Sequence, residues 1–149
     1  LPQDRVGVMV GETPGVGVEM GRLLTAHEPR ALDLTFNFDV LDELFAPGYR
    51  EHQFGLKPTV QGIKEDITYL RSAFPDLHLT IEDMIADEDS VWARMVARGT
   101  NEGPFIGPPT GRPMEITVID ILRFENGLIV DHWGVPDRFA AMAQLGLLP

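Results

Sequence analysis

The sequence predicts an α+β domain in which helices come first and pack on one face of an antiparallel sheet. Apolar residues recur at helical spacing as far as Phe74, and from Leu77 onward they alternate with polar residues as in strands. Short turn sequences separate the alternating segments, which favours a meander of neighbouring strands. Helices and strands that are segregated along a chain in this way are typical of the α+β class.

Composition predicts one globular domain over residues 1–149 and narrows the classes of partner. The chain has 12 Lys and Arg against 23 Asp and Glu, and this net charge of −11 disfavours nucleic acid and anionic membranes as partners. It has no cysteine, so disulfides and thiolate chemistry are excluded, and we expect a cytoplasmic protein. No apolar run approaches the roughly 18 residues of a membrane span. The glycine-rich residues 1–17 are expected to be irregular.

Three helical segments are expected before the sheet. The first covers residues 20–24, and the second covers residues 40–45 with Asp39 as its N-cap. The third is the clearest, because Pro58 opens it, Pro75 ends it and one apolar stripe runs along it.

The segment PGYREHQF, residues 47–54, is expected to be a loop, because Pro47-Gly48 stops the second helix. Tyr49, His52 and Gln53 lie in this segment and are expected at the mouth of a cavity between helices and sheet. In an enzyme these side chains would hydrogen-bond a developing oxyanion, and His52 is the candidate catalytic group among them.

Four strands are expected after the third helix, over residues 77–82, 91–99, 114–124 and 128–135. The turn Glu125-Asn126-Gly127 predicts that the last two strands form a hairpin. Asp137 is expected to cap a short closing helix, with Gly146 just beyond its end.

Asp120 stands in the middle of an otherwise apolar strand face. The even positions from Met114 to Phe124 are apolar apart from this residue. Burying an unpaired carboxylate is costly, so either a partner lies close or the pKa rises. Both arrangements suit a general acid or base; the alternative is a structural acid paired to the backbone, Arg94 or Arg98. We therefore take Asp120 as the candidate catalytic acid or base.

The neighbours of Asp120 depend on the hairpin register. A two-residue Asn126-Gly127 turn places Trp133 opposite Asp120, whereas a three-residue turn places His132 there. Trp133 offers an N–H donor, and His132 offers a group that titrates near neutral pH. The candidate substrate-binding residues are Tyr49, Gln53, Trp92, Arg94, Leu122, His132 and Trp133. The four histidines lack a metal-ligand spacing, so no metal is expected.

Four phrases in order, LDELFAPGYREH, GTNEGPFIGPPTGR, IDILRFENGLIVDHW and MAQLGLLP, give the chain a family likeness. Residues 19–149 resemble the SnoaL-like polyketide cyclases of the NTF2-like, or ketosteroid-isomerase-like, superfamily. The resemblance implies a cone-shaped α+β fold that encloses an apolar cavity, and a homodimer. It also implies cofactor-free acid/base chemistry on a carbonyl or epoxide substrate.

The sequence departs from that family at its catalytic position. By alignment, the resemblance implies that Gly134 replaces a catalytic Asp of the last strand, and Gly134 therefore joins the candidate substrate-binding residues. The partner position on the preceding strand, a His in some of these cyclases, is Asp120, and Asn101 stands where a His is common. Two alternatives follow: the acid has moved to the opposite strand, or the usual acid/base reaction is lost.

The expected function is that of a cofactor-independent cyclase of secondary metabolism, such as antibiotic biosynthesis, which closes a ring on an apolar, polyketide-like substrate. Ring closure follows either from acid/base, aldol-type chemistry at Asp120 or from positioning of a polyene for a cycloaddition. One alternative is epoxide opening, for which Asp39 is the candidate second acid. Another is a non-catalytic small-molecule-binding protein of the same fold.

Overall fold

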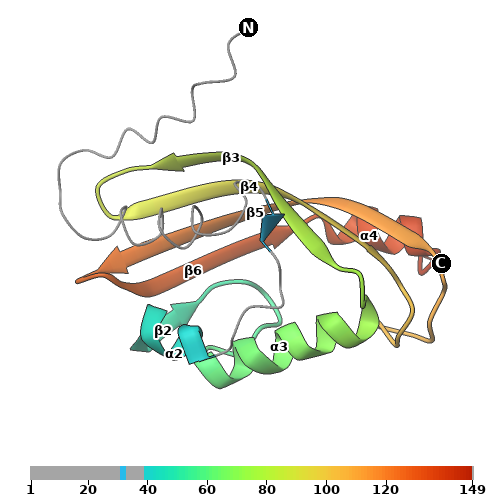
Figure 1. The fold of residues 1–149 in the computed structure, drawn as a ribbon, viewed down its shortest axis with the longest axis horizontal. Helices are drawn as coiled ribbons and strands as arrows, with labels where there is room; N and C mark the ends of the chain where they lie inside the picture. The colour runs from blue at the N-terminus through green and yellow to red at the C-terminus, as the bar shows by residue number, and fades with distance from the viewer. Residues whose placement is uncertain (1–30, 33–38, 149) are drawn as a thin grey trace, which may run out of the picture.

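The computed structural model describes residues 31–32 and 39–148, which form one sheet of six strands with helices packed on it (Figure 1). The elements, in chain order, are β1 (Ala31–Leu32), α2 (Asp39–Leu44), β2 (Phe45–Glu51), α3 (Val60–Ala73), β3 (His78–Ala86), β4 (Ser90–Thr100), β5 (Pro113–Glu125), β6 (Leu128–Pro136) and α4 (Arg138–Leu145). The α+β class is confirmed. The helix expected over residues 20–24 and the irregular residues 1–17 lie outside the described residues, as does the side chain of Asp39.

The helix ends follow the capping residues of the sequence. The hydroxyl of Thr59 accepts a hydrogen bond from the backbone N–H of Gly62 at 3.0 Å, which fixes the start of α3. Asp137 accepts from the N–H of Ala140 at 2.9 Å and starts α4 in the same way. Gly146 ends α4 in the left-handed conformation at φ 71°, where a side chain would be strained.

The four expected strands are confirmed as β3 to β6, which pair in sequence order as an antiparallel meander. Asn126 and Gly127 form the tight turn between β5 and β6, and both have positive φ, at 51° and 80°. A bulge at Val130 then shifts the register by one residue, so Asp120 pairs with Gly134. Both expected registers, with Trp133 or His132 opposite Asp120, are therefore wrong.

The expected loop after α2 is also wrong, because most of it is strand β2. This strand begins at Phe45, one residue after α2 ends, and it pairs in parallel with β6 at the sheet edge. Arg50 lies beside Asp131 and Glu51 lies beside His132. Pro47-Gly48 falls within an irregularity of this pairing, which is where a sheet edge tolerates proline.

The two faces of the sheet differ in what covers them. The inner face, which contains the even positions of β5, packs on α3 and α4 through a core formed by Ala73, Phe74, Ala97, Met114, Ile116, Ala141 and Leu145. In Figure 1, α3 lies below the sheet, close to α2 and β2. The outer face contains the odd positions of β5 and carries Trp92, whose residue surface is 52% exposed. None of the described helices is long and apolar enough to cross a membrane.

Candidate active site

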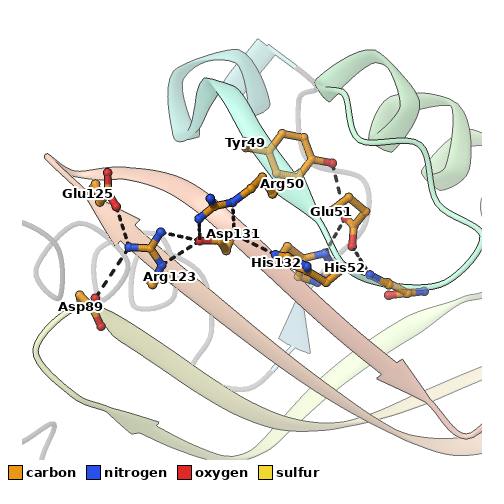
Figure 2. A network of polar contacts seen from close by, with 10 residues as sticks. Tyr49, Arg50, Glu51, His52, Asp89, Arg123, Glu125, Asp131 and His132 are labelled. Carbon is orange, nitrogen blue, oxygen red and sulfur yellow. Dashed lines mark hydrogen bonds and ion pairs between the residues drawn. The ribbon is translucent and has the colours of Figure 1, made fainter.

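A chain of three charged side chains lies on the inner face, where β2, β6 and β5 adjoin. Oε2 of Glu51 lies 2.8 Å from Nδ1 of His132, and Nε2 of the same ring lies 3.6 Å from Oδ1 of Asp120. Figure 2 shows the Glu51–His132 contact, with Tyr49 above it. The side chain of Glu51 is fully buried, whereas that of Asp120 is 29% exposed. Asp120 is therefore the end of the chain that a small molecule can reach.

His132 is held in its protonated form at neutral pH. Burial lowers the pKa of its ring, but the contacts with the negatively charged Asp120 and Glu51 outweigh burial and raise the pKa to about 9. The pKa of the Tyr49 phenol is raised as well, first by burial and then by the charge of Glu51. The site thus places one cation between two carboxylates.

Gln53 and Gly134 form the wall beside Asp120. A Cβ atom built on Gly134 would lie 1.8 Å from Oε1 of Gln53 and 3.1 Å from Oδ1 of Asp120. The side chain of Gln53 therefore occupies the space that any side chain at position 134 would need. Glycine is required at position 134 because the Gln53 side chain approaches its backbone so closely. The Gln53 amide therefore lies next to the Asp120 carboxylate.

A second charged group lies on the outer face of the same three strands. Asp131 is 1% exposed and accepts from Nε and Nη2 of Arg50, each at 2.7 Å, and from Nε of Arg123 at 2.7 Å. Nε2 of His52 lies 2.8 Å from Asp131, and the His52 ring stacks on Trp133 with centroids 4.3 Å apart. The hydrogen bond from Arg50, followed by those from His52 and Arg123, holds the pKa of Asp131 far below its usual range despite burial. Figure 2 shows this group beside the Glu51–His132 pair of the inner face.

The structure separates the expected site residues into two sets. On the inner face it brings Asp120 together with four of the candidate substrate-binding residues, Leu122, His132, Gly134 and Gln53. Tyr49 joins them through its hydroxyl, which lies 3.4 Å from Glu51. On the outer face lie His52, Trp92, Arg94 and Trp133, away from Asp120.

Neither of the expected arginine partners, Arg94 and Arg98, lies beside Asp120. Arg94 pairs in register with Ile119 on the outer face, and Arg98 donates to Glu115 at 2.7 Å. Asn101, the position where the related cyclases often carry a His, is fully buried in the loop after β4. Its amide donates to the Gly103 carbonyl at 2.7 Å and its oxygen accepts from the Thr110 N–H at 2.9 Å, so it holds the loop together.

Glu51 is the residue of the site that the sequence reasoning missed. Its position depends on the parallel pairing of β2 with β6, between residues about eighty positions apart, and no local pattern indicates that pairing. The phrase Tyr49-Arg50-Glu51-His52 was itself a signal, because alternation of its charged residues is compatible with a strand that has two polar faces.

Two surface hollows lie away from this site. One, of about 470 Å³, runs along the exposed side of α3 by Lys64 and Tyr69, and the other, of about 340 Å³, lies by Asp76 and Gln144. Neither hollow brings together charged side chains arranged as Glu51, His132 and Asp120 are. The candidate site is therefore assigned from these side chains and not from the surface hollows. The apolar cavity at Asp120 stays a prediction. Within the described residues, no group of three or more His, Asp or Glu is arranged to hold a metal.

Comparison with known proteins gives the family. The family model described as SnoaL-like polyketide cyclase matches residues 30–145. DauD of Streptomyces sp. (strain C5), named an aklanonic acid methyl ester cyclase, is 29% identical over 128 residues, which cover 84% of this chain and 78% of DauD. The solved structure of TsrD from Streptomyces laurentii is 30% identical, with a TM-score of 0.72 over 89% of this chain and 95% of TsrD. IdmH from Streptomyces antibioticus is 36% identical, with a TM-score of 0.65 over 74% of this chain and 87% of IdmH.

The chain belongs to the SnoaL-like polyketide cyclase family, because the family model spans most of its length. The solved structures share its fold, which confirms the expected NTF2-like architecture. By class, the protein is a polyketide cyclase enzyme.

Proposed function

We propose that the protein is a cofactor-independent cyclase of antibiotic biosynthesis that closes a ring on an apolar, polyketide-type substrate by acid/base chemistry at Asp120. The observation that carries the proposal is the setting of this carboxylate. It lies on the inner face, is partly exposed, and faces a protonated His132 at 3.6 Å. That distance is long for a hydrogen bond, so the carboxylate retains capacity for a substrate group, and such contacts tighten when substrate binds.

The reaction is an internal aldol-type addition. An oxygen of Asp120 takes a proton from the carbon next to a substrate carbonyl, and the resulting enolate carbon bonds to a second carbonyl carbon of the same molecule. The alkoxide formed there takes up the proton, so the product is an isomer of the substrate and Asp120 is ionised again. The His132 cation and the Gln53 amide stabilise the negative oxygen that develops.

The charge of the site favours a neutral substrate. Glu51 and Asp120 carry two negative charges against the single positive charge of His132, and the whole chain carries −11. An anionic substrate would be repelled by this group. DauD is named for a methyl ester substrate, in which a carboxyl group is neutralised. We therefore assign the chain an uncharged polyketide ester or ketone as substrate class.

The second candidate function is ring closure in which the protein only positions the substrate. The absence of a side chain at Gly134 favours it. The β6 position that the resemblance aligns with the family acid carries no side chain here. The cavity would then fold a polyene and polarise a carbonyl through His132 and Gln53, with no proton transfer by Asp120. Epoxide opening needs two free carboxyl groups. Glu51, the carboxylate near Asp120 among the described side chains, is already bound to His132, and the side chain of Asp39 lies outside the described residues.

Substitution of Asp120 by Asn separates the two reactions. The variant keeps the shape of the side chain but cannot exchange a proton, so turnover falls by roughly 10²–10⁴ if Asp120 is the acid/base group. Asp83→Asn, at an exposed position of β3, is the matched control and keeps full activity. The assay follows cyclisation of neutral polyketide esters, with aklanonic acid methyl ester as the first probe. If the folded Asp120→Asn enzyme keeps nearly full turnover, acid/base catalysis by Asp120 is rejected and ring closure by positioning is favoured.

We also propose that the enzyme works as a cytoplasmic homodimer that pairs through its outer face. Ile85, Trp92, Ile121 and Trp133 pair in register across β3 to β6, and Ile85 and Trp92 are 67% and 52% exposed. An apolar row of this kind on a sheet face marks an interaction surface. Native mass measurement of wild type and Trp92→Glu tests the proposal, which predicts a dimer that the substitution weakens. A monomeric wild type would overturn it.

A further inference from the structure

Glu51 is a fully buried carboxylate that the proposed reaction does not use directly. A buried charge of this kind is costly unless hydrogen bonds satisfy it. Here each oxygen has a donor: Oε2 lies 2.8 Å from the Nδ1 of His132 and accepts from Tyr49, and Oε1 accepts the backbone N–H of Gln53 at 2.7 Å. Two of these three donors belong to residues that flank Asp120.

The contact with His132 fixes the direction of the imidazole ring. The raised pKa keeps the ring protonated at neutral pH, so both nitrogens carry a proton: Nδ1 donates to Glu51, and the proton on Nε2 points toward Asp120. Without an acceptor at Glu51, Nδ1 would be a buried, unsatisfied donor and the ring would be free to turn. The carboxylate therefore sets both the protonation and the orientation of the group that faces Asp120.

The contact with Gln53 fixes the second wall of the site. The backbone of Gln53, two residues after the end of β2, is held by Oε1 of Glu51, and from there its side-chain amide fills the space that a Cβ atom on Gly134 would occupy, beside Asp120. One carboxylate thus anchors both polar neighbours of Asp120, although it does not itself contact Asp120.

We infer that Glu51 is the positioning residue of this active site, which aims His132 and seats Gln53 so that Asp120 is flanked by one cation and one amide. The inference rests on the proposed function of Asp120. It concerns organisation and not proton transfer, because Glu51 lies behind His132 as seen from Asp120. Two other titratable groups lie near this carboxylate, Tyr49 on β2 and Asp66 on α3, and burial raises the pKa of both.

The first test titrates His132 and needs no substrate. Imidazole NMR of the full chain, with the signal assigned by its loss in His132→Gln, follows the ring through its protonation in wild type, Glu51→Gln and Glu51→Asp. Glu51→Gln removes the charge and is expected to move the pKa of His132 from about 9 toward the ordinary 6.5. Glu51→Asp keeps the charge with a shorter arm and gives an intermediate value. The exposed Glu125→Gln is the matched control and leaves the signal unchanged. An unchanged titration in Glu51→Gln would overturn the inference.

The second test measures cyclisation. Glu51→Gln is expected to lower kcat by roughly 10- to 100-fold with little change in KM, less than the loss at a reacting group. Combined with His132→Gln, it adds little further loss, because its effect on that ring is already lost and the amide oxygen that replaces the carboxylate can still accept the Gln53 N–H. Additive losses would overturn the inference, and so would full kcat in folded Glu51→Gln.

If Glu51→Gln does not fold, the test rests on Glu51→Asp. In that variant, an unchanged His132 pKa together with an unchanged kcat would reject the positioning role. Failure of the proposed function is distinct, because it appears as full turnover in Asp120→Asn whatever the His132 titration shows.

Discussion

Two charged groups lie back to back where β2 meets β6, and they are built from residues that alternate along both strands. Arg50, His52 and Asp131 point to the outer face, whereas Glu51 and His132 point to the inner face. The outer carboxylate has two arginines and a histidine bound to it. The inner histidine has two carboxylates, one of them 3.6 Å away and partly exposed.

The difference between the groups is the degree to which their carboxylates are satisfied. Every oxygen of Asp131 has a charged donor at hydrogen-bond distance, and the residue is 1% exposed, so it has no capacity for another partner. Asp120 lacks a short charge-assisted hydrogen bond to His132 and is open to solvent. A saturated buried group stabilises the fold, whereas an unsaturated, accessible one is available for chemistry.

Asp131→Asn is expected to give the largest change in stability. The substitution removes the buried charge that binds both Arg50 and Arg123, and breaking a buried ion pair is strongly destabilising, although Arg123 keeps its ion pair with Glu125 at 2.6 Å. Because Arg50 is 63% exposed and can turn to solvent, we expect the lower end of that range, a fall in Tm of roughly 6–12 °C. Differential scanning fluorimetry measures it against Asp120→Asn, whose Tm should fall by less, because Asp120 is 29% exposed and its contact with His132 is 3.6 Å long. Equal losses of Tm in the two variants would contradict the division into a structural and a reactive group.

The two groups should also titrate at opposite ends of the pH scale. The pKa of His132 is raised to about 9 in the folded chain, so its contribution is complete below about pH 6.5 and is lost as the pH rises through 9. We expect on the order of 2 kcal/mol here, because solvent reaches Asp120 and weakens the pair. The pKa of Asp131 is lowered, so its contribution is present above the ordinary carboxyl range and is lost in acid.

Urea denaturation across the pH range measures these two limbs. His132→Gln flattens the alkaline limb between about pH 6.5 and 9 and leaves the acid limb unchanged, and Asp131→Asn does the reverse. A wild-type alkaline limb retained in His132→Gln would show that another group causes it.

The sequence predicts the features that depend on neighbouring residues, and it does not predict those that depend on pairing between distant segments. Alternation along β5 is local, so it correctly places Asp120 on the inner face with Met114 and Phe124. Capping residues are local too, and they locate α3 and α4. The partner of Asp120 is not local, because one unpaired residue, Val130, shifts the register and puts Gly134 opposite.

The outer group and Glu51 are beyond prediction for a related reason. Strand β2 contains Pro47-Gly48, which reads as a stop signal in a window of a few residues. Its pairing with β6 is parallel, and no turn joins the two strands to indicate it. The family likeness adds one correct element: the positions it aligns as partners, Gly134 and Asp120, are a cross-strand pair in the structure.

Gly134→Ala is expected to act on the inner group alone. The added Cβ displaces the flexible Gln53 side chain, so the Tm changes little, but kcat falls by roughly tenfold because the amide leaves its place beside Asp120. Gln53→Ala should cause a similar loss, and the double variant should be no worse than either single variant. Gly48→Ala is the matched control, since a Cβ there meets nothing within 4 Å. Steady-state cyclisation kinetics decide, and full kcat in Gly134→Ala would contradict a role for the Gln53 amide.

The smallest effect is expected for Arg50→Lys, on the outer group. Lysine keeps the charge but loses the two parallel hydrogen bonds to Asp131, which retains Arg123 as its second cation. Because the Arg50 side chain is 63% exposed, the pair is screened, and the Tm should fall by only roughly 1–3 °C. Arg123→Lys, at a side chain that is 26% exposed, should cost more, and added salt should erase the Arg50 effect before the Arg123 effect. Cyclisation should be unchanged in Arg50→Lys, since the substitution touches the outer face only. A loss of kcat at constant Tm would show instead that Asp131 transmits a change through the backbone of β6 to its neighbour His132, and the two faces would then have to be treated as one site.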